Sequence, residues 1–139
     1  MMLKNLFRTN PNSIQINVAL LIARVAIGLM MLTHGWPKLQ QLFGGEPIQF
    51  ASVFGMSETL SLVMAVFAEV ICSLLLILGL ATRLAVIPLI VTMLIAVLHI
   101  HGADPFSVKE TGTLFLLVFV ILLIMGSGKY SVDAIISRR

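Results

Sequence analysis

The chain has 139 residues, of which 59% are hydrophobic and only 11% are charged, and its formal net charge is +3. A soluble domain is usually about half apolar and about one quarter charged, so we expect much of this surface to face lipid. The small, scattered positive charge excludes a nucleic-acid interface. The single cysteine, Cys72, excludes a disulfide framework and a CxxC redox pair.

The N-terminal region resembles a signal peptide only superficially. Lys4 and Arg8 precede an apolar run, but Arg24 interrupts that run and no clean cleavage site follows. We therefore interpret the region as a retained anchor. The spacing of the apolar residues over 3–7 beside these charges predicts a short helix lying along the inner membrane surface.

Four segments are apolar and long enough to span a membrane, since about 20 helical residues cross a hydrocarbon core of about 30 Å. The predicted spans are Ile16–Trp36, Leu60–Leu80, Leu84–His101 and Glu110–Gly126. The very short connection Ala81–Arg83 makes the second and third spans an antiparallel hairpin. Residues 1–139 are thus predicted to form a single all-α membrane domain, a four-helix antiparallel bundle.

The lysines and arginines that flank the spans indicate the orientation. One side carries Lys4, Arg8, Arg83, Lys129, Arg138 and Arg139, and the other carries only Lys38 and Lys109. The bias predicts that both termini are cytoplasmic. In a bacterium the first and third loops would then face the periplasm.

Two ionisable residues are predicted to lie inside the bilayer. Counted inward from the span ends at about 1.5 Å per residue, Arg24 and Glu69 lie at depths of roughly 10 and 16 Å, a gap that an arginine side chain covers. We therefore predict a buried Arg24–Glu69 ion pair. Two interpretations remain open: a structural pair that fixes helix register, and a carboxylate that takes part in proton transfer.

Helical phase groups several of these residues on shared faces. One stripe of the first span contains Arg24, Gly28, Met31, His34, Gly35 and Lys38, and one face of the second span contains Ser61, Ala65, Glu69 and Ser73. Small residues on both faces favour close helix packing. Pro37 is expected to kink or end the first helix.

All three histidines fall at the outer ends of the predicted spans. We predict one polar ligand-binding site there, because unpartnered titratable groups are costly in lipid. Its members are His34, Lys38, His99 and Glu110, roofed by the loop around Phe50 and Phe54. On a helix His101 points about 200° away from His99 and joins the site only if the helix ends before it.

A metal centre at this site is the less favoured alternative. Its ligands would be His34, His99, His101 and Glu110, but no HExxH or Cys/His spacing supports it. The remaining interpretation is that the histidines are interfacial and bind carbonyl groups and water.

Several motifs together resemble the DoxX family of small bacterial membrane proteins over nearly the whole chain. They are Arg24 followed by "HGWPKL" (34–39), "AEVICSLLLILGLATRLA" (68–85), the histidine ending the third span, Glu110, and "GSGKYSVD" (126–133). The resemblance implies a multi-pass protein of the bacterial inner membrane. Some members of that family are associated with quinone-linked sulfur oxidation or with redox-stress complexes.

The favoured function is therefore a membrane subunit that supports a quinone-linked redox system. The cofactor would be a quinone, whose headgroup suits histidine and lysine donors beside apolar walls, and the partner a soluble oxidoreductase or a second copy. A small anion attracted by Lys38 and Lys109 would also suit the site. The alternatives are a transporter or channel component with Arg24 and Glu69 on a polar path, and a membrane scaffold. No autonomous catalytic motif is present, so whether the protein is an enzyme stays open.

Overall fold

The computed structural model describes residues 8–138, which contain helices and loops and no strand. Four helical stretches are long and apolar enough to cross a membrane: Ser13–Phe43, Glu58–Leu78, Thr82–Ile100 and Phe106–Met125. The all-α class and the four predicted spans are therefore confirmed. The surface helix predicted over residues 3–7 lies outside the described residues.

The first helix, α2 (Ser13–Phe43), extends beyond the predicted span at both ends. It begins with a capping box, in which Gln15 N donates to Asn12 Oδ1 (2.8 Å) and Asn12 N donates to Gln15 Oε1 (2.9 Å). Pro37 does not end the helix. A proline removes only one backbone donor, whereas an unwound segment within lipid would expose many polar groups.

The second span consists of α3 (Glu58–Val66), the π-helix η1 (Phe67–Cys72) and α4 (Ser73–Leu78). Ser57 caps α3 by accepting a hydrogen bond from Leu60 N at 3.1 Å. A π-helix accommodates an extra residue within a helical stretch and often marks a functional site. Glu69 lies inside this π-helix.

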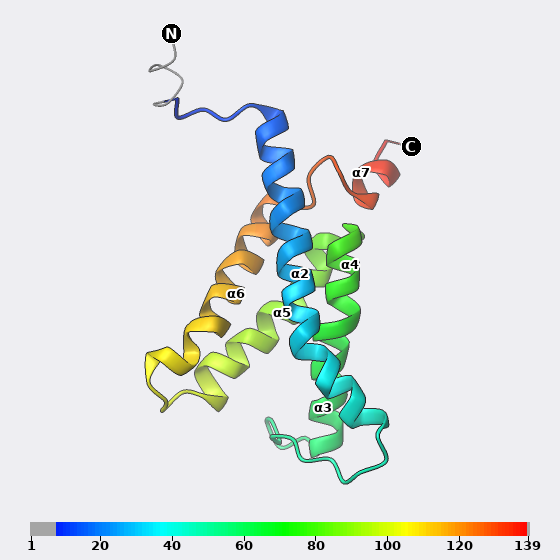
Figure 1. The fold of residues 1–139 in the computed structure, drawn as a ribbon, viewed down its shortest axis with the longest axis vertical. Helices are drawn as coiled ribbons and strands as arrows, with labels where there is room; N and C mark the ends of the chain where they lie inside the picture. The colour runs from blue at the N-terminus through cyan, green and yellow to red at the C-terminus, as the bar shows by residue number, and fades with distance from the viewer. Residues whose placement is uncertain (1–7, 139) are drawn as a thin grey trace.

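The third span combines α5 (Thr82–Leu94) with a second π-helix, η2 (Ile95–Ile100), and the fourth is α6 (Phe106–Met125). Figure 1 shows the start of α2 and the short α7 (Val132–Ile136) at one end of the molecule, and the α2–α3 loop at the other. Toward that second end α5 and α6 lean away together from α2 and α3. This divergence separates the halves of the helices nearer the α2–α3 loop.

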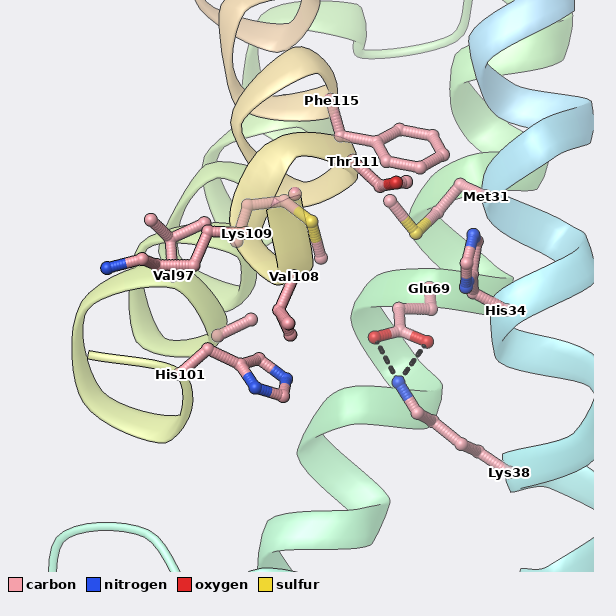
Figure 2. A pocket seen from close by; sticks show the side chains of 13 residues that line it. Met31, His34, Lys38, Glu69, Val97, His101, Val108, Lys109, Thr111 and Phe115 are labelled. Atoms are coloured by element: carbon pink, nitrogen blue, oxygen red, sulfur yellow. Dashed lines mark hydrogen bonds and ion pairs between the residues drawn. The ribbon is translucent and has the colours of Figure 1, made fainter. Parts of the chain in front are cut away.

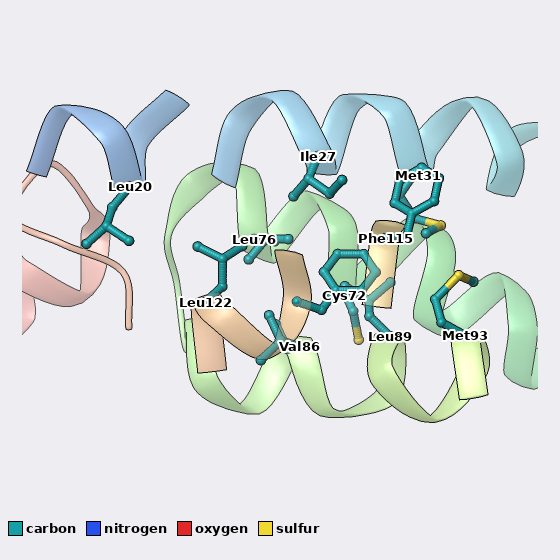
Figure 3. Close-up of a cluster of buried hydrophobic side chains, with 12 residues drawn as sticks. Leu20, Ile27, Met31, Cys72, Leu76, Val86, Leu89, Met93, Phe115 and Leu122 are labelled. Carbon is teal, nitrogen blue, oxygen red and sulfur yellow. The ribbon is translucent and has the colours of Figure 1, made fainter. Parts of the chain in front are cut away.

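A hydrophobic core joins all four spans (Figure 3). Gly28 allows α2 to approach α4 closely, because a Cβ atom at this position would lie 2.6 Å from Ile77 Cγ1. The buried members of this core include Leu20, Ile27, Met31, Cys72, Leu76, Val86, Leu89, Phe115, Phe119 and Leu122. The core therefore fixes α2 against the second span.

At the end of the bundle where α2 begins, residues 126–133 form what we call the C-terminal clasp. The guanidinium of Arg24, which is 2% exposed, donates to the backbone oxygens of Ser127 and of Tyr130, the latter at 2.7 Å. Lys129 N donates to Asn17 Oδ1 at 2.7 Å. These bonds attach the clasp to α2.

A carboxylate attaches the same clasp to the start of α5. Asp133 accepts hydrogen bonds from Ala81 N at 2.7 Å and from Thr82 N at 3.0 Å, and its own backbone N–H donates to Gly79 O at 2.9 Å. Its side chain thereby satisfies amides at the N-terminus of a helix, where no intrahelical acceptor exists. The clasp thus connects α2, α4 and α5.

Candidate functional site

Lys38 and Glu69 form an ion pair between α2 and η1. Lys38 Nζ lies 2.5 and 2.6 Å from the two carboxylate oxygens of Glu69 (Figure 2). Glu69 is 2% exposed and the Lys38 side chain 29% exposed. Gly35 brings the two helices together here, because a Cβ atom on it would lie 3.0 Å from Glu69 Cβ. The pair is therefore buried on its acidic side and partly open on its basic side.

The predicted Arg24–Glu69 pair is wrong. Arg24 lies about 21 Å from Lys38 along α2, and its guanidinium binds the C-terminal clasp instead. The predicted depths assumed that the ends of the first two spans are level. In the structure Arg24 lies beside Gly79, at the C-terminal end of α4. Lys38 and not Arg24 therefore reaches Glu69.

A polar cleft of about 210 Å³ opens beside this pair, between α2, η1, η2 and α6. His34, Lys38, Glu69, His101, Lys109 and Thr111 supply its polar groups, and Met31, Met93, Val97 and Phe115 supply apolar walls. Two of the predicted site residues, His34 and Lys38, therefore share one cavity. Glu69, His101 and Lys109 join them.

The basic groups of the cleft differ in how they are held. The ring of His34 packs edge-on against Phe115, with centroids 5.4 Å apart. His101 Nδ1 lies 2.7 Å from Asp104 Oδ2. The ammonium of Lys109 points away from Glu69 (Figure 2) and donates to Gly102 O at 3.1 Å. The charge nearest the middle of the cleft is therefore that of the Lys38–Glu69 pair.

His99 and Glu110 do not join the cleft, contrary to the prediction. His99 is exposed, and its ring lies 5.2 Å from that of Phe54. Glu110 is exposed on α6, whereas the next residue, Thr111, lines the cleft. The wider turn of η2 changes the helical phase at the end of the third span. As a result, His101 reaches the cleft instead of His99.

The metal alternative is not supported either. Within residues 8–138 no group of three or more His, Cys, Asp or Glu side chains is placed to hold a metal ion. His34 and His101 line the cleft while His99 and Glu110 lie outside it. The four residues considered as ligands are therefore not assembled around one point.

A second cavity, which we call the apolar chamber, lies on the other side of the ion pair. Its volume is about 370 Å³ and its walls are predominantly hydrophobic, including Phe50, Val53, Met64, Phe67, Val91 and Ile95. Lys38, Glu69 and Ala96 line both cavities. Lys38 Nζ lies 5.9 Å from the centroid of the Phe50 ring, within reach of a cation–π contact.

The loop around Phe50 and Phe54 therefore covers the apolar chamber, and the prediction that it roofs the histidine site is wrong. The Lys38–Glu69 contact and the chamber were both missed from the sequence. The stripes on the first two spans carried a usable signal for the contact. If Gly35 is placed against the carboxylate at the centre of the facing small-residue stripe, Lys38 follows one turn later.

Comparison with known families matches residues 19–102 to the DoxX family. No curated protein and no solved structure matches the chain. The matched region runs from within α2 to just beyond η2, so it includes the ion pair and most residues of both cavities. Since this region is more than half of the sequence, the chain belongs to the DoxX family.

Proposed function

We propose that this protein is a multi-pass membrane subunit that binds the headgroup of a lipid-soluble quinone and supports a quinone-linked redox system. One observation carries the proposal: the Lys38–Glu69 pair lies in the wall between a polar cleft and an apolar chamber. Sites for small organic ligands combine apolar walls with a few placed polar groups.

The charge at the cleft favours a neutral headgroup over an anion. Glu69 neutralises Lys38 at contact distance, and the ammonium of Lys109 is engaged by the Gly102 carbonyl. An ammonium has three donors, so Lys38 keeps one for a ligand after its two contacts with Glu69. A quinone carbonyl is a neutral acceptor of this kind, and the His34 imidazole provides a second polar contact.

The residues between Arg24 and Glu69 support the transporter alternative less than they support ligand binding. Arg24 and Glu69 are separated along the bundle by a layer that includes Ile27, Met31 and Leu76, all less than 10% exposed. A polar path for a solute or ion needs polar groups or water along its length. This layer favours ligand binding at the outer end over conduction through the bundle.

The proposal places the protein in the bacterial inner membrane as an antiparallel bundle with both termini cytoplasmic. The excess of Lys and Arg on one side supports this orientation. The two ends of the described chain lie at the same end of the molecule, which suits termini on one side of the membrane (Figure 1). The cleft is then in the outer half of the membrane. The chain would obtain electrons from a partner, a soluble oxidoreductase, since no redox motif is present in its own sequence.

The test is a quinone titration of the purified protein in quinone-free lipid nanodiscs, with a short-chain quinone as probe. We expect saturable binding that the double variant Lys38→Met/Glu69→Leu weakens by about tenfold or more, equivalent to about 1.4 kcal/mol. Lys129→Met, the same change at the opposite end, should leave the affinity unchanged. Absence of saturable binding to the unaltered protein would overturn the proposal.

A further inference from the structure

We propose that the apolar chamber is the binding site for the hydrocarbon chain of the same ligand, which enters it from the lipid side beneath the α2–α3 loop. This inference rests on the proposed function for the headgroup and adds where the chain lies. The ligand is therefore an amphiphile that is bent around the Lys38–Glu69 pair, with its neutral ring in the polar cleft and its chain in the chamber.

The two cavities share part of their walls at the ion pair. Lys38, Glu69 and Ala96 belong to the walls of both. Ala96, on the η2 side, has only a methyl side chain, so it is the smallest side chain in the shared wall. In the proposed arrangement the ring is held by Lys38 and its substituent passes over Ala96 into the chamber.

The loop closes the chamber toward the aqueous side. Val53, which is 6% exposed, is held by a hydrogen bond from its backbone N–H to Ser61 Oγ at 3.1 Å. The ring of Phe54 packs on His99 of η2 at 5.2 Å. The loop is therefore attached to both the second and the third span, and Phe50 projects from it into the chamber wall.

The open side of the chamber faces the hydrocarbon layer. Met64, Phe67, Ile87 and Val91 line it and are each between 47% and 54% exposed, and all four belong to the second and third membrane-spanning helices. The medium at that mouth is lipid, so only an apolar chain can enter there. The volume of about 370 Å³ falls within the range of roughly 300–1,000 Å³ for small-molecule sites.

An acyl chain of an ordinary phospholipid has the same chemistry and is the competing occupant. The two occupants predict different effects of the ligand's chain length on its affinity. If the chamber receives the ligand's own chain, the affinity for the ligand depends on the chain length. If it receives a lipid chain, the affinity for the headgroup is independent of the length of any substituent on the ring.

The first experiment compares three quinones that share one ring and carry no chain, a short chain or a long isoprenoid chain. Each is titrated into nanodiscs, and its concentration is expressed per mole of lipid. Expressed in this way, the affinity no longer includes the partitioning of the chain into the bilayer. We expect affinity to rise by about tenfold from no chain to long chain. Equal affinities for all three would overturn the chain site and leave the proposed headgroup site intact, whereas no binding of any of them would overturn the proposed function.

The second experiment fills the chamber. Val91→Trp places a large ring at the mouth of the chamber, and Val63→Trp makes the same change at a lipid-facing position of α3 that does not line it. Val91→Trp should remove the advantage of the long chain and leave the affinity for the chain-free quinone unchanged. A long-chain advantage that survives Val91→Trp, or is lost equally in Val63→Trp, would overturn the inference.

Discussion

The ammonium of Lys38 contacts both carboxylate oxygens of Glu69, although the two residues lie on different spans and Glu69 has almost no exposed surface. The contact lies where Gly35 brings the backbone of α2 against η1. A buried pair of this kind contributes little net stability, because desolvation offsets the attraction, but the loss of one partner is costly. The pair therefore fixes the register of α2 against the second span.

This contact predicts a strong coupling between the two residues. Lys38→Met and Glu69→Leu should each lower the free energy of unfolding by about 1–3 kcal/mol, because each leaves one charge unpaired. The double variant should lose less than the sum, by about 1 kcal/mol or more. Unfolding in mixed micelles measures all four proteins, and additive losses would show that the two side chains do not interact.

The C-terminal clasp should depend on Arg24. Arg24→Leu removes the hydrogen bonds to the Ser127 and Tyr130 carbonyls and should expose the bond after Lys129 to trypsin. Charged hydrogen bonds contribute about 1.5–3 kcal/mol each, so cleavage should be at least tenfold faster. Arg8→Leu is the matched control, since Arg8 is an exposed arginine that precedes α2. Equal cleavage rates in the two variants would contradict the role assigned to Arg24.

The same clasp should loosen at acidic pH through Asp133. Burial raises the pKa of this carboxyl, but hydrogen bonds from the Thr82 and Ala81 amides outweigh that effect and hold its pKa below the usual value. The ionised form therefore stabilises the clasp above the unfolded-state pKa of about 3.9, and this stability is lost as the pH falls through the lower folded-state pKa. Between pH 7 and pH 5 no change is expected.

A nitroxide spin label reports this transition locally. Ile135 is 62% exposed, and Ile135→Cys can be labelled selectively because the native Cys72 is buried. The label should become more mobile only below about pH 4. In a protein that also carries Asp133→Asn the label should be mobile at every pH. An unchanged, immobile label in that variant would show that the carboxylate does not hold the clasp.

The π-helix η1 predicts an unusual tolerance of deletion. Removal of Ile71, which is 46% exposed, lets residues 67–72 return to α-helical spacing while Glu69 keeps its place relative to α3. Deletion of Leu117, 57% exposed on the regular helix α6, rotates everything after it by about 100°. The first protein should fold in detergent with near-normal yield and the second should not, as size-exclusion profiles would show. Equal losses would contradict this.

Hydropathy alone was sufficient to predict the number and approximate positions of the spans, because lipid imposes both length and apolar character. It did not predict helix ends. The capping box at Asn12 starts α2 three residues before the predicted span, and the helix continues past Pro37 to Phe43, about two turns beyond it. The depth count also assumed that the first two spans end at one level, whereas Arg24 lies beside Gly79 at the end of α4. The count therefore paired Arg24 with Glu69 and missed Lys38.

The candidate site was predicted only in part for a related reason. His34 and Lys38 line one cavity because they lie on one regular stripe of α2. The place of His101 was not predicted, because ideal periodicity fails across η2, where the wider turn changes which histidine faces inward. The apolar chamber has no sequence signature, since its lining residues are indistinguishable from lipid-facing ones until the helices diverge.

The bonds of Arg24 also have a consequence for biosynthesis. Its two carbonyl partners lie 103 and 106 residues further along the chain, so they do not yet exist when the first helix leaves the ribosome. An arginine in a membrane helix costs about 2.5–3.5 kcal/mol at the bilayer centre and less near its edge. Until residues 127–130 have been synthesised, the guanidinium must be solvated by water, by lipid phosphate or by polar groups of the insertion machinery. The first helix therefore reaches its final depth late in assembly, although it is made first.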